Sequence, residues 1–262
     1  MRRFAGYAFD LDGTIYLGDS LLPNAEQTIG KVRAAGGRVV FMTNKPLETA
    51  QDYAAKLSSL GIQAGPQDIV TALDSLIVYL GERHERARLL PIAEPLVAET
   101  LAHHGFTVTF DPAAADVVVV SFDRTFDYAK LNAAYRAVKL HGAVVVATNP
   151  DPYCPTPDGG LPDCAAMLAA VEASTGVAAE AVLGKPSGYM ARAVLERLAV
   201  AAADAAMVGD RITTDIAMAQ DHGLAGILVL TGATSREDVR AATIKPDFVI
   251  EDLGGLLPAE GC

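Results

Sequence analysis

The chain has 262 residues, of which 51% are hydrophobic and 20% charged, a length and composition typical of a globular protein with a substantial buried core. Its formal net charge of −11, without any lysine or arginine cluster, argues against nucleic acid as a partner. No apolar run approaches the roughly 18 residues of a membrane span, and the apolar stretch 4–9 is too short for a signal-peptide core, so we expect a cytoplasmic protein without a membrane partner.

Strand-like and helix-like segments alternate from the start of the chain. Residues 6–10 predict a buried strand, and residues 38–43 predict the next one. The segment 23–37 between them predicts a helix with Asn24 as its N-cap, and 46–61 predicts a second helix with a proline in its first turn. This alternation favours a Rossmann-like α/β fold, in which helices cover both faces of a doubly wound parallel sheet.

The rest of the chain continues this alternation around one long irregular segment. That segment, 149–163, is rich in proline and glycine, and a loop of this length in a compact fold is more often functional than not. The further predicted strands lie at 87–93, 106–110, 115–122, 143–148, 205–210, 225–231 and 246–252, and the further predicted helices at 94–105, 127–142 and 164–176.

Two carboxylates close the first predicted strand, in the stretch YAFDLDGT. Asp10 and Asp12 would repel each other by about 3 kcal/mol if both were ionised roughly 5 Å apart at an effective dielectric near 20. A cation between them, or a proton on one of them, would relieve this repulsion. Gly13 follows directly, and a glycine there lets backbone N–H groups approach an anion, although an Asp-Gly pair is also a common turn.

Polar residues also follow the second predicted strand and open a later loop. Thr43 and Asn44 end that strand just before a helix, where hydroxyl and amide groups suit phosphate oxygens, although both residues are ordinary in turns and caps. Lys185 lies between Gly184 and Pro186, ahead of another helix. Its surroundings do not complete a Walker A motif, so a phosphate ligand and a solvated lysine both remain open.

Two further aspartates follow another hydrophobic strand. Asp210 ends that strand, and Asp215 comes five residues later, where it can either point back at the strand end or complement a helix dipole. Because the carboxyl ends of parallel strands meet at one edge, we expect up to four carboxylates and one lysine to gather there. Oxygen ligands without histidine or cysteine select a hard cation, so the sequence predicts Mg²⁺.

Together these motifs resemble those of the haloacid dehalogenase superfamily. FDLDGT, the TN that follows a strand, GKPS and GDRITTD occur in the order of that family's four motifs. Roughly 140 residues separate Asn44 from Lys185, which leaves room for an inserted domain and is similar to the class IIA (NagD-like) phosphatases with a C2-type α/β cap. The resemblance implies a catalytic core at 1–82 and 182–262 with a cap at 83–181.

Carried onto this sequence, the resemblance implies an aspartyl-phosphate mechanism. Asp10 would attack phosphorus, and Asp12 would protonate the leaving oxygen and then activate water. An aspartate at position 12 also favours cleavage of a phosphate ester over dehalogenation, because a halide leaves without a proton. The implied Mg²⁺ ligands are Asp10, the backbone carbonyl of Asp12, and Asp210, with Asp215 orienting them; the implied phosphate ligands are Gly13, Thr43, Asn44 and Lys185.

The resemblance therefore predicts a Mg²⁺-dependent phosphatase that acts on a small phosphorylated metabolite. Relatives of this class include sugar-phosphate, phosphoglycolate and 4-nitrophenyl phosphatases. The stretch ATNPD at 147–151 also resembles a segment of caps of this class, which makes Asn149 and Asp151 candidate substrate contacts, unless the loop only connects a strand to a helix. Relatives commonly form dimers through the cap, so the resemblance also allows a homodimer.

Two other functions use similar residues. A phosphotransferase or mutase would pass the phosphoryl group to a hydroxyl other than water, and the sequence leaves this alternative open. A receiver-type signalling module also combines acidic residues, Mg²⁺, threonine and lysine, but it is a single domain of about half this length. It also lacks an Asp-x-Asp pair at the first strand, which argues against it here.

Overall fold

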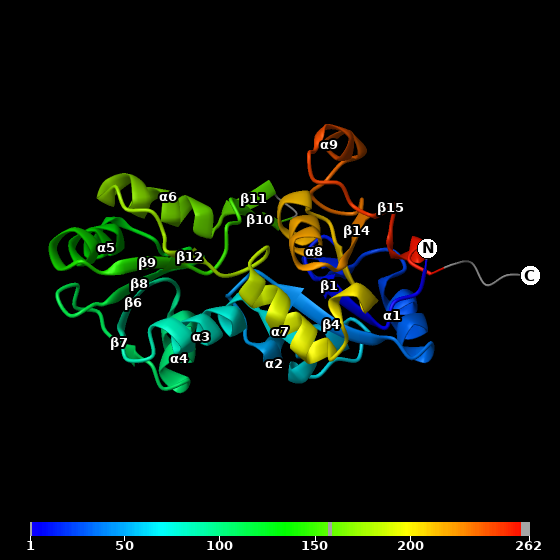
Figure 1. The fold of residues 1–262 in the computed structure, drawn as a ribbon, viewed down its shortest axis with the longest axis horizontal. Helices are drawn as coiled ribbons and strands as arrows, with labels where there is room; N and C mark the ends of the chain where they lie inside the picture. The colour runs from blue at the N-terminus through cyan, green and yellow to red at the C-terminus, as the bar shows by residue number, and fades with distance from the viewer. Residues whose placement is uncertain (1, 157–158, 258–262) are drawn as a thin grey trace, which may run out of the picture.

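The computed structural model describes residues 2–156 and 159–257, whose two large β-sheets lie at opposite ends of an elongated ribbon (Figure 1). The six-stranded sheet is wholly parallel. The strands that come next in the chain after the central strand β1 lie on one side of it, and the later strands lie on the other side. This is the doubly wound arrangement that the sequence predicts. The strand order is β15 (Phe248–Ile250), β14 (Ala225–Val229), β13 (Ala205–Gly209), β1 (Gly6–Asp10), β4 (Arg38–Thr43) and β5 (Ile69–Thr71).

Helices cover both faces of the six-stranded sheet, because alternate residues of each buried strand point to opposite faces. One apolar cluster packs the sheet against α1 (Ala25–Ala34) and α2 (Ala50–Ser59). A second cluster packs the opposite face against α7 (Gly188–Leu198) and α8 (Ala217–His222). The predicted Rossmann-like α/β fold is therefore confirmed.

The five-stranded sheet is also parallel and is covered on both faces. On one face it packs against α5 (Tyr128–His141) and α6 (Cys164–Thr175), seen in green in Figure 1, and on the other against α3 (Ala72–Arg83) and α4 (Pro95–His103). Its strand order is β12 (Ala181–Val182), β9 (Val144–Ala147), β8 (Val117–Val120), β6 (Arg88–Ile92) and β7 (Thr107–Val108).

The starts of the first two predicted helices are only partly as expected. Asn24 is the N-cap residue of α1, as predicted, but it has a left-handed backbone with φ of 63° and makes no capping hydrogen bond through its side chain. The second helix begins at Ala50 and not near Pro46. The reason is a capping box, in which Thr49 accepts a hydrogen bond from the backbone N of Asp52 and the Asp52 carboxylate accepts one from the backbone N of Thr49.

The segment 149–163, expected to be irregular, contains an antiparallel hairpin. Its strands are β10 (Tyr153–Thr156) and β11 (Gly159–Pro162), and the two residues between them lie outside the described part of the chain. A second, smaller hairpin, β2 (Tyr16–Leu17) with β3 (Ser20–Leu21), follows the first strand and was not predicted. In each case short strands pair with a strand close by in the sequence, without the long apolar run on which the sequence prediction depends.

The remaining elements are short. They are 3₁₀ turns at Pro66–Asp68, Ala202–Asp204 and Leu253–Gly255, a π-helical turn at Ile212–Ile216, and α9 (Arg236–Ala241). Within the ranges 2–156 and 159–257, no helix combines the length and the apolar character that crossing a bilayer requires.

Candidate active site

The carboxyl ends of the central strands carry most of the predicted site residues. Asp10, the last residue of β1, lies opposite Met42 of β4. Thr43 and Asn44 follow Met42 directly, so they lie beside Asp10 at the end of the neighbouring strand. Asp210 comes directly after β13, the other neighbour of β1. The parallel register thus brings these four site residues to one edge, as the sequence predicts.

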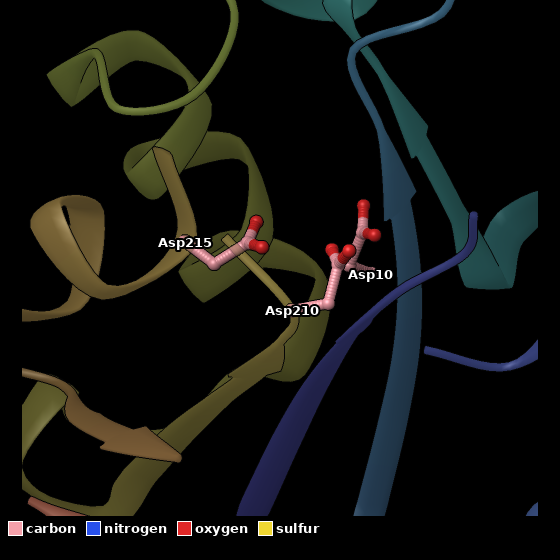
Figure 2. A group of neighbouring side chains, drawn as sticks. All are labelled: Asp10, Asp210 and Asp215. Atoms are coloured by element: carbon pink, nitrogen blue, oxygen red, sulfur yellow. The ribbon is translucent and has the colours of Figure 1, made fainter. Parts of the chain in front are cut away.

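Figure 2 shows three carboxylates from this edge facing one another. One oxygen from each of Asp10, Asp210 and Asp215 lies within 4.8 Å of the others, and all three residues are buried. Asp215 belongs to the π-helical turn at 212–216, and its Oδ2 accepts a hydrogen bond from the backbone N of Arg211 at 2.9 Å. Of the two orientations that the sequence allows for Asp215, the structure selects the one that points back at the strand ends.

The side chain of Lys185 lies among these carboxylates. Its Nζ donates a hydrogen bond to Asp10, and a second one to Asp215 Oδ1 at 2.7 Å. Only 4% of Lys185 is exposed, which excludes the solvated lysine that the sequence left open. One ammonium group faces three carboxylates, so the cluster carries an excess of negative charge unless it binds protons or another cation.

The protonation of the cluster follows from burial and from this crowding. Burial raises the pKa of Asp10 well above its ordinary value, against the opposing effect of Lys185. Burial and the charge of Asp215 raise the pKa of Asp210 to about 6. Burial lowers the pKa of Lys185, but Asp10 and Asp215 outweigh it and the net shift is upward, so the lysine stays charged. The net negative charge of the cluster therefore favours the binding of a further proton or cation.

The donor set fits a divalent cation. Asp210 Oδ1 is buried and has no hydrogen-bond partner among the described residues, whereas its Oδ2 accepts a hydrogen bond from the backbone N of Ala233. An oxygen without a partner, beside oxygens of Asp10 and Asp215, is a ligand set for a hard cation such as Mg²⁺. The site also has no room for a side chain at Gly13, because a Cβ there would lie 2.5 Å from Asp210 Oδ2.

Asn44 connects the end of β4 to the loop of Lys185. Its Oδ1 accepts a hydrogen bond from the backbone N of Lys185 at 2.7 Å, and its Nδ2 donates to the backbone O of the same residue at 3.2 Å. Thr43 is buried beside it, and Thr43 Oγ1 accepts a hydrogen bond from the backbone N of Lys45 at 3.1 Å. Of the two predicted phosphate ligands of this strand, Asn44 therefore lies next to Lys185, and Thr43 directly precedes it.

Asp12 stands apart from the three clustered carboxylates. It is half-buried, and it is the negative charge that most strongly affects Lys45. Burial lowers the pKa of Lys45, but the negative charges around it, that of Asp12 first, raise it overall. The contact of the Asp12 backbone carbonyl with Mg²⁺ remains a prediction.

The two candidate substrate contacts of the segment 149–163 lie between the two sheets. Asn149 is fully buried, and its Nδ2 donates to the backbone O of Asn44 at 3.0 Å. Asp151 is 8% exposed, and its Oδ2 accepts a hydrogen bond from Asn44 Nδ2 at 2.8 Å. Both side chains are engaged with the six-stranded sheet, and their role toward a substrate remains a prediction.

Sequence reasoning missed two cations of this site. Arg211 donates through Nη1 to Asp151 Oδ1 at 3.4 Å and through Nη2 to the backbone O of Tyr153 at 3.1 Å. Lys45 lies near Asp12, as described above. The only signal in the sequence is that each directly follows a motif residue, and adjacency does not tell where a long side chain points.

Comparisons with known proteins agree with this geometry. A family model described as haloacid dehalogenase-like hydrolase matches residues 7–107, and a related HAD-hydrolase-like model matches residues 182–256. The chain is 32% identical over 249 residues to the sugar-phosphatase AraL of Bacillus subtilis, covering 95% of this chain and 90% of that protein. This chain belongs to the haloacid dehalogenase-like hydrolases.

Solved structures of other haloacid dehalogenase-like hydrolases have the same fold. The 4-nitrophenylphosphatase of Thermotoga maritima is 35% identical, with a TM-score of 0.90 and coverage of 97% of this chain and 96% of that one. The glycerol phosphate phosphatase of Mycobacterium tuberculosis, solved in complex with magnesium, is 32% identical with a TM-score of 0.88, covering 96% of this chain and 76% of that one. The predicted family and the predicted enzyme class, a phosphoric monoester hydrolase, are confirmed.

Proposed function

We propose that this hydrolase is a Mg²⁺-dependent phosphatase that cleaves small phosphate monoesters through an aspartyl-phosphate intermediate. The observation that carries the proposal is the buried edge where Asp10 meets Lys185, Asp210 and Asp215. A nucleophilic carboxylate, a fixed cation and a set of oxygen donors are the groups that phosphoryl transfer requires.

Asp10 acts as the nucleophile and Asp12 as the acid and base. An Asp10 oxygen attacks phosphorus while the bond from phosphorus to the leaving oxygen breaks, and Asp12 gives its proton to that oxygen. Water then attacks phosphorus and gives a proton to Asp12, and the bond between Asp10 and phosphorus breaks to release inorganic phosphate. The separate position of Asp12, half-buried and outside the carboxylate cluster, supports a role toward the leaving group.

Asp10, Asp210 and the backbone carbonyl of Asp12 would hold Mg²⁺, and Asp215 would orient them. The Oδ1 of Asp210 supports this assignment, because it has no hydrogen-bond partner within 2–156 and 159–257, as does the magnesium complex of the relative from M. tuberculosis. The ion, when bound, offsets the charge of the cluster and of the phosphoryl oxygens.

Lys185, Asn44, Thr43 and Gly13 bind the phosphoryl group. The ammonium of Lys185 is already fixed by two carboxylates, so it offsets charge in the transition state without first having to be ordered. The absence of a side chain at Gly13 lets backbone N–H groups approach the anion. Thr43 supplies its hydroxyl from the adjacent strand end, and Asn44 supplies its backbone N–H, because its side-chain amide already donates to Asp151 and to the backbone O of Lys185.

A small phosphorylated metabolite is the proposed substrate, with sugar phosphates first. The phosphatases to which the chain is similar carry the names of sugar, 4-nitrophenyl and glycerol phosphate phosphatases.

We also infer a core at 1–82 and 182–262 and a cap at 83–181, because the five-stranded sheet is built from strands between Arg88 and Val182. A homodimer through the cap is a further proposal, testable by the mass of the protein in solution.

The test is release of inorganic phosphate from a panel of esters with and without Mg²⁺. The panel holds 4-nitrophenyl phosphate, several sugar phosphates, phosphoglycolate, glycerol phosphate, pyridoxal phosphate and nucleotides. We expect Mg²⁺-dependent release that excess EDTA abolishes and added Mg²⁺ restores. Undiminished release in EDTA would overturn the metal assignment, and transfer of phosphate to an added alcohol in preference to water would favour the phosphotransferase alternative.

A further inference from the structure

We propose that Asp151 is a positioning residue of the phosphatase, which holds the phosphate-binding residue Asn44 in place and does not contact the leaving group. The inference rests on the proposed function. It departs from the expectation, drawn from the sequence, that Asp151 contacts substrate.

The first step of the argument is the hydrogen-bond chain that ends on the lysine. Asp151 Oδ2 accepts a hydrogen bond from Asn44 Nδ2 at 2.8 Å, and the backbone O of Lys185 accepts a second, longer one at 3.2 Å, so Asp151 and Lys185 together fix the rotation of the Asn44 amide. The same amide presents Oδ1 to the backbone N of Lys185 at 2.7 Å. An amide that rotated away would release the loop that carries the lysine ammonium. Asp151 therefore acts on the phosphate site through one intermediate residue.

The second step is that Asn149 and Asp151 hold Asn44 from two sides. Asn149 Nδ2 donates to the backbone O of Asn44 at 3.0 Å, and Asn149 Oδ1 accepts from the backbone N of Asp151 at 2.9 Å. A Cβ at Gly184 would lie 2.5 Å from Asn44 Oδ1 and 2.7 Å from the backbone O of Thr148. The Asn44 amide is therefore packed closely against the backbone at Gly184, and Asp151 is joined to it both directly and through Asn149.

The third step is the occupancy of the second carboxylate oxygen. Asp151 Oδ1 faces Arg211 Nη1 at 3.4 Å, and Arg211 also donates to the backbone O of Tyr153 at 3.1 Å. Arg211 directly follows Asp210, so this pair ties the strand end that carries an acidic site residue to the segment after β9. Both oxygens of Asp151 have partners from the six-stranded side, and only 8% of the residue is exposed.

A positioning role makes a prediction that a substrate contact does not. Because Asn44 and Lys185 bind the phosphoryl group common to all esters, loss of Asp151 must weaken turnover of every ester by one factor. A group that contacts the leaving group would instead weaken some esters far more than others. The binding of inorganic phosphate, which has no leaving group, must weaken as well.

The test compares Asp151→Ala and Asp151→Asn with the wild-type holoenzyme in Mg²⁺. We expect kcat/KM of Asp151→Ala to fall by about tenfold or more, since small displacements of catalytic groups cost factors of this size. The factor should agree within about threefold between 4-nitrophenyl phosphate and a hydrolysed sugar phosphate, and the inhibition constant of inorganic phosphate should rise. The isosteric Asp151→Asn keeps one acceptor oxygen and should restore part of the loss.

The matched control is Asp116→Ala, which removes another arginine-paired carboxylate of the five-stranded sheet. Asp116 accepts hydrogen bonds from Arg88 at the amino end of β8, away from Asn44, so its loss should leave kcat/KM unchanged. If Asp151→Ala does not fold, Asp151→Asn decides, with a uniform loss of about threefold or more as support.

Three results would overturn the inference. These are unchanged kcat/KM in Asp151→Asn and in any folded Asp151→Ala, losses that differ more than about tenfold between esters, and unchanged inhibition by phosphate. Wild-type protein that turns over no ester would instead overturn the proposed function, and the inference with it. Wild-type turnover alongside unaffected variants would overturn the inference alone.

Discussion

At the scale of single residues, the electrostatics of the site depend on how Lys185 is shared. Its ammonium contacts Asp10 and Asp215, whereas Asp210 keeps one oxygen without a partner among the described residues. The lysine therefore does not balance the negative charge of Asp210, which lies beside the proposed nucleophile. A divalent cation bound there would reduce the repulsion between the aspartates.

Replacement of Asp10, the proposed nucleophile, should separate activity from folding. Asp10→Asn keeps the volume of the side chain and an acceptor for Lys185, but an amide cannot form the aspartyl-phosphate. We expect kcat to fall by a factor on the order of 10³ or more, with cooperative thermal unfolding retained. Phosphate release and circular dichroism melting check this, and near-normal turnover would remove Asp10 from its proposed role.

A second residue, Asp163, should make stability depend on pH. It is the N-cap of α6, and burial raises its pKa to about 7 from an ordinary value near 3.8. Between these two values the folded state binds the proton more readily than the unfolded state, so the free energy of unfolding falls as pH rises toward 7. The loss amounts to up to about 4 kcal/mol.

Asp163→Asn should abolish this part of the pH dependence. Asparagine caps helices as well as aspartate does and carries no charge to bury. We expect the variant to be more stable than wild type at pH 8 and close to it at pH 4. Denaturant unfolding at both pH values measures the difference, and a variant that gains nothing at pH 8 would contradict the assignment.

At the scale of elements, the turn that follows β1 shows why a strand end can form a site. Gly13 has φ of +89°, and a Cβ there would meet Asp210 Oδ2. The strand therefore ends in a turn that only glycine allows, close to an aspartate from the neighbouring strand. Backbone conformation and proximity together determine the residue type at this position.

Two glycine variants separate these two causes. Gly13→Ala should lose activity by about tenfold or more, because the new methyl group displaces Asp210. Gly36→Ala is the control, since Gly36 also has a positive φ, of +82°, but no atom of the described part of the chain lies within 4 Å of its Cβ position. We expect it to cost about 1 kcal/mol of stability and no activity. Equal activity in both variants would show that proximity to Asp210 is unimportant.

At the scale of the whole molecule, the two sheets meet through segments that follow their strands. Asn149 comes after β9 and Lys185 after β12 of the five-stranded sheet, and they contact Asn44 and Asp10 of the six-stranded sheet. The contacts that hold Asn44 beside Lys185 therefore depend on how the two sheets pack together. Binding at this junction must stabilise the whole fold, because the unfolded chain has no such site.

Mg²⁺ should accordingly raise the melting temperature. At a concentration about 100 times the dissociation constant, linkage predicts about 2.7 kcal/mol of stabilisation, or several degrees. Asp210→Asn should require much more Mg²⁺ for the same shift, because it removes one proposed ligand. Scanning calorimetry across a Mg²⁺ titration tests this, and equal shifts in wild type and variant would exclude Asp210 from the metal site.

Much of this protein could be predicted from local patterns in its sequence. The apolar runs, and the glycines and prolines that separate them, predicted the doubly wound sheet. Because Asp10, Asn44 and Asp210 stand at the ends of such runs, they were predicted to be neighbours. The physical reason is that a parallel sheet with right-handed crossovers brings the carboxyl ends of its strands together whatever lies between them. The family's motif order then gave the enzyme class.

Only the tertiary structure decided how the long and the polar side chains are used. From the sequence alone, Lys185 could have been solvated and Asp215 could have complemented a helix dipole. Asp151 is held by Asn44 and Arg211, each of which lies more than 50 residues away from it in the sequence. Adjacency in sequence does not specify these contacts, because they depend on how two separate sheets pack against each other. Where the chain leaves a strand is a local property, whereas what a side chain touches there is a property of the whole fold.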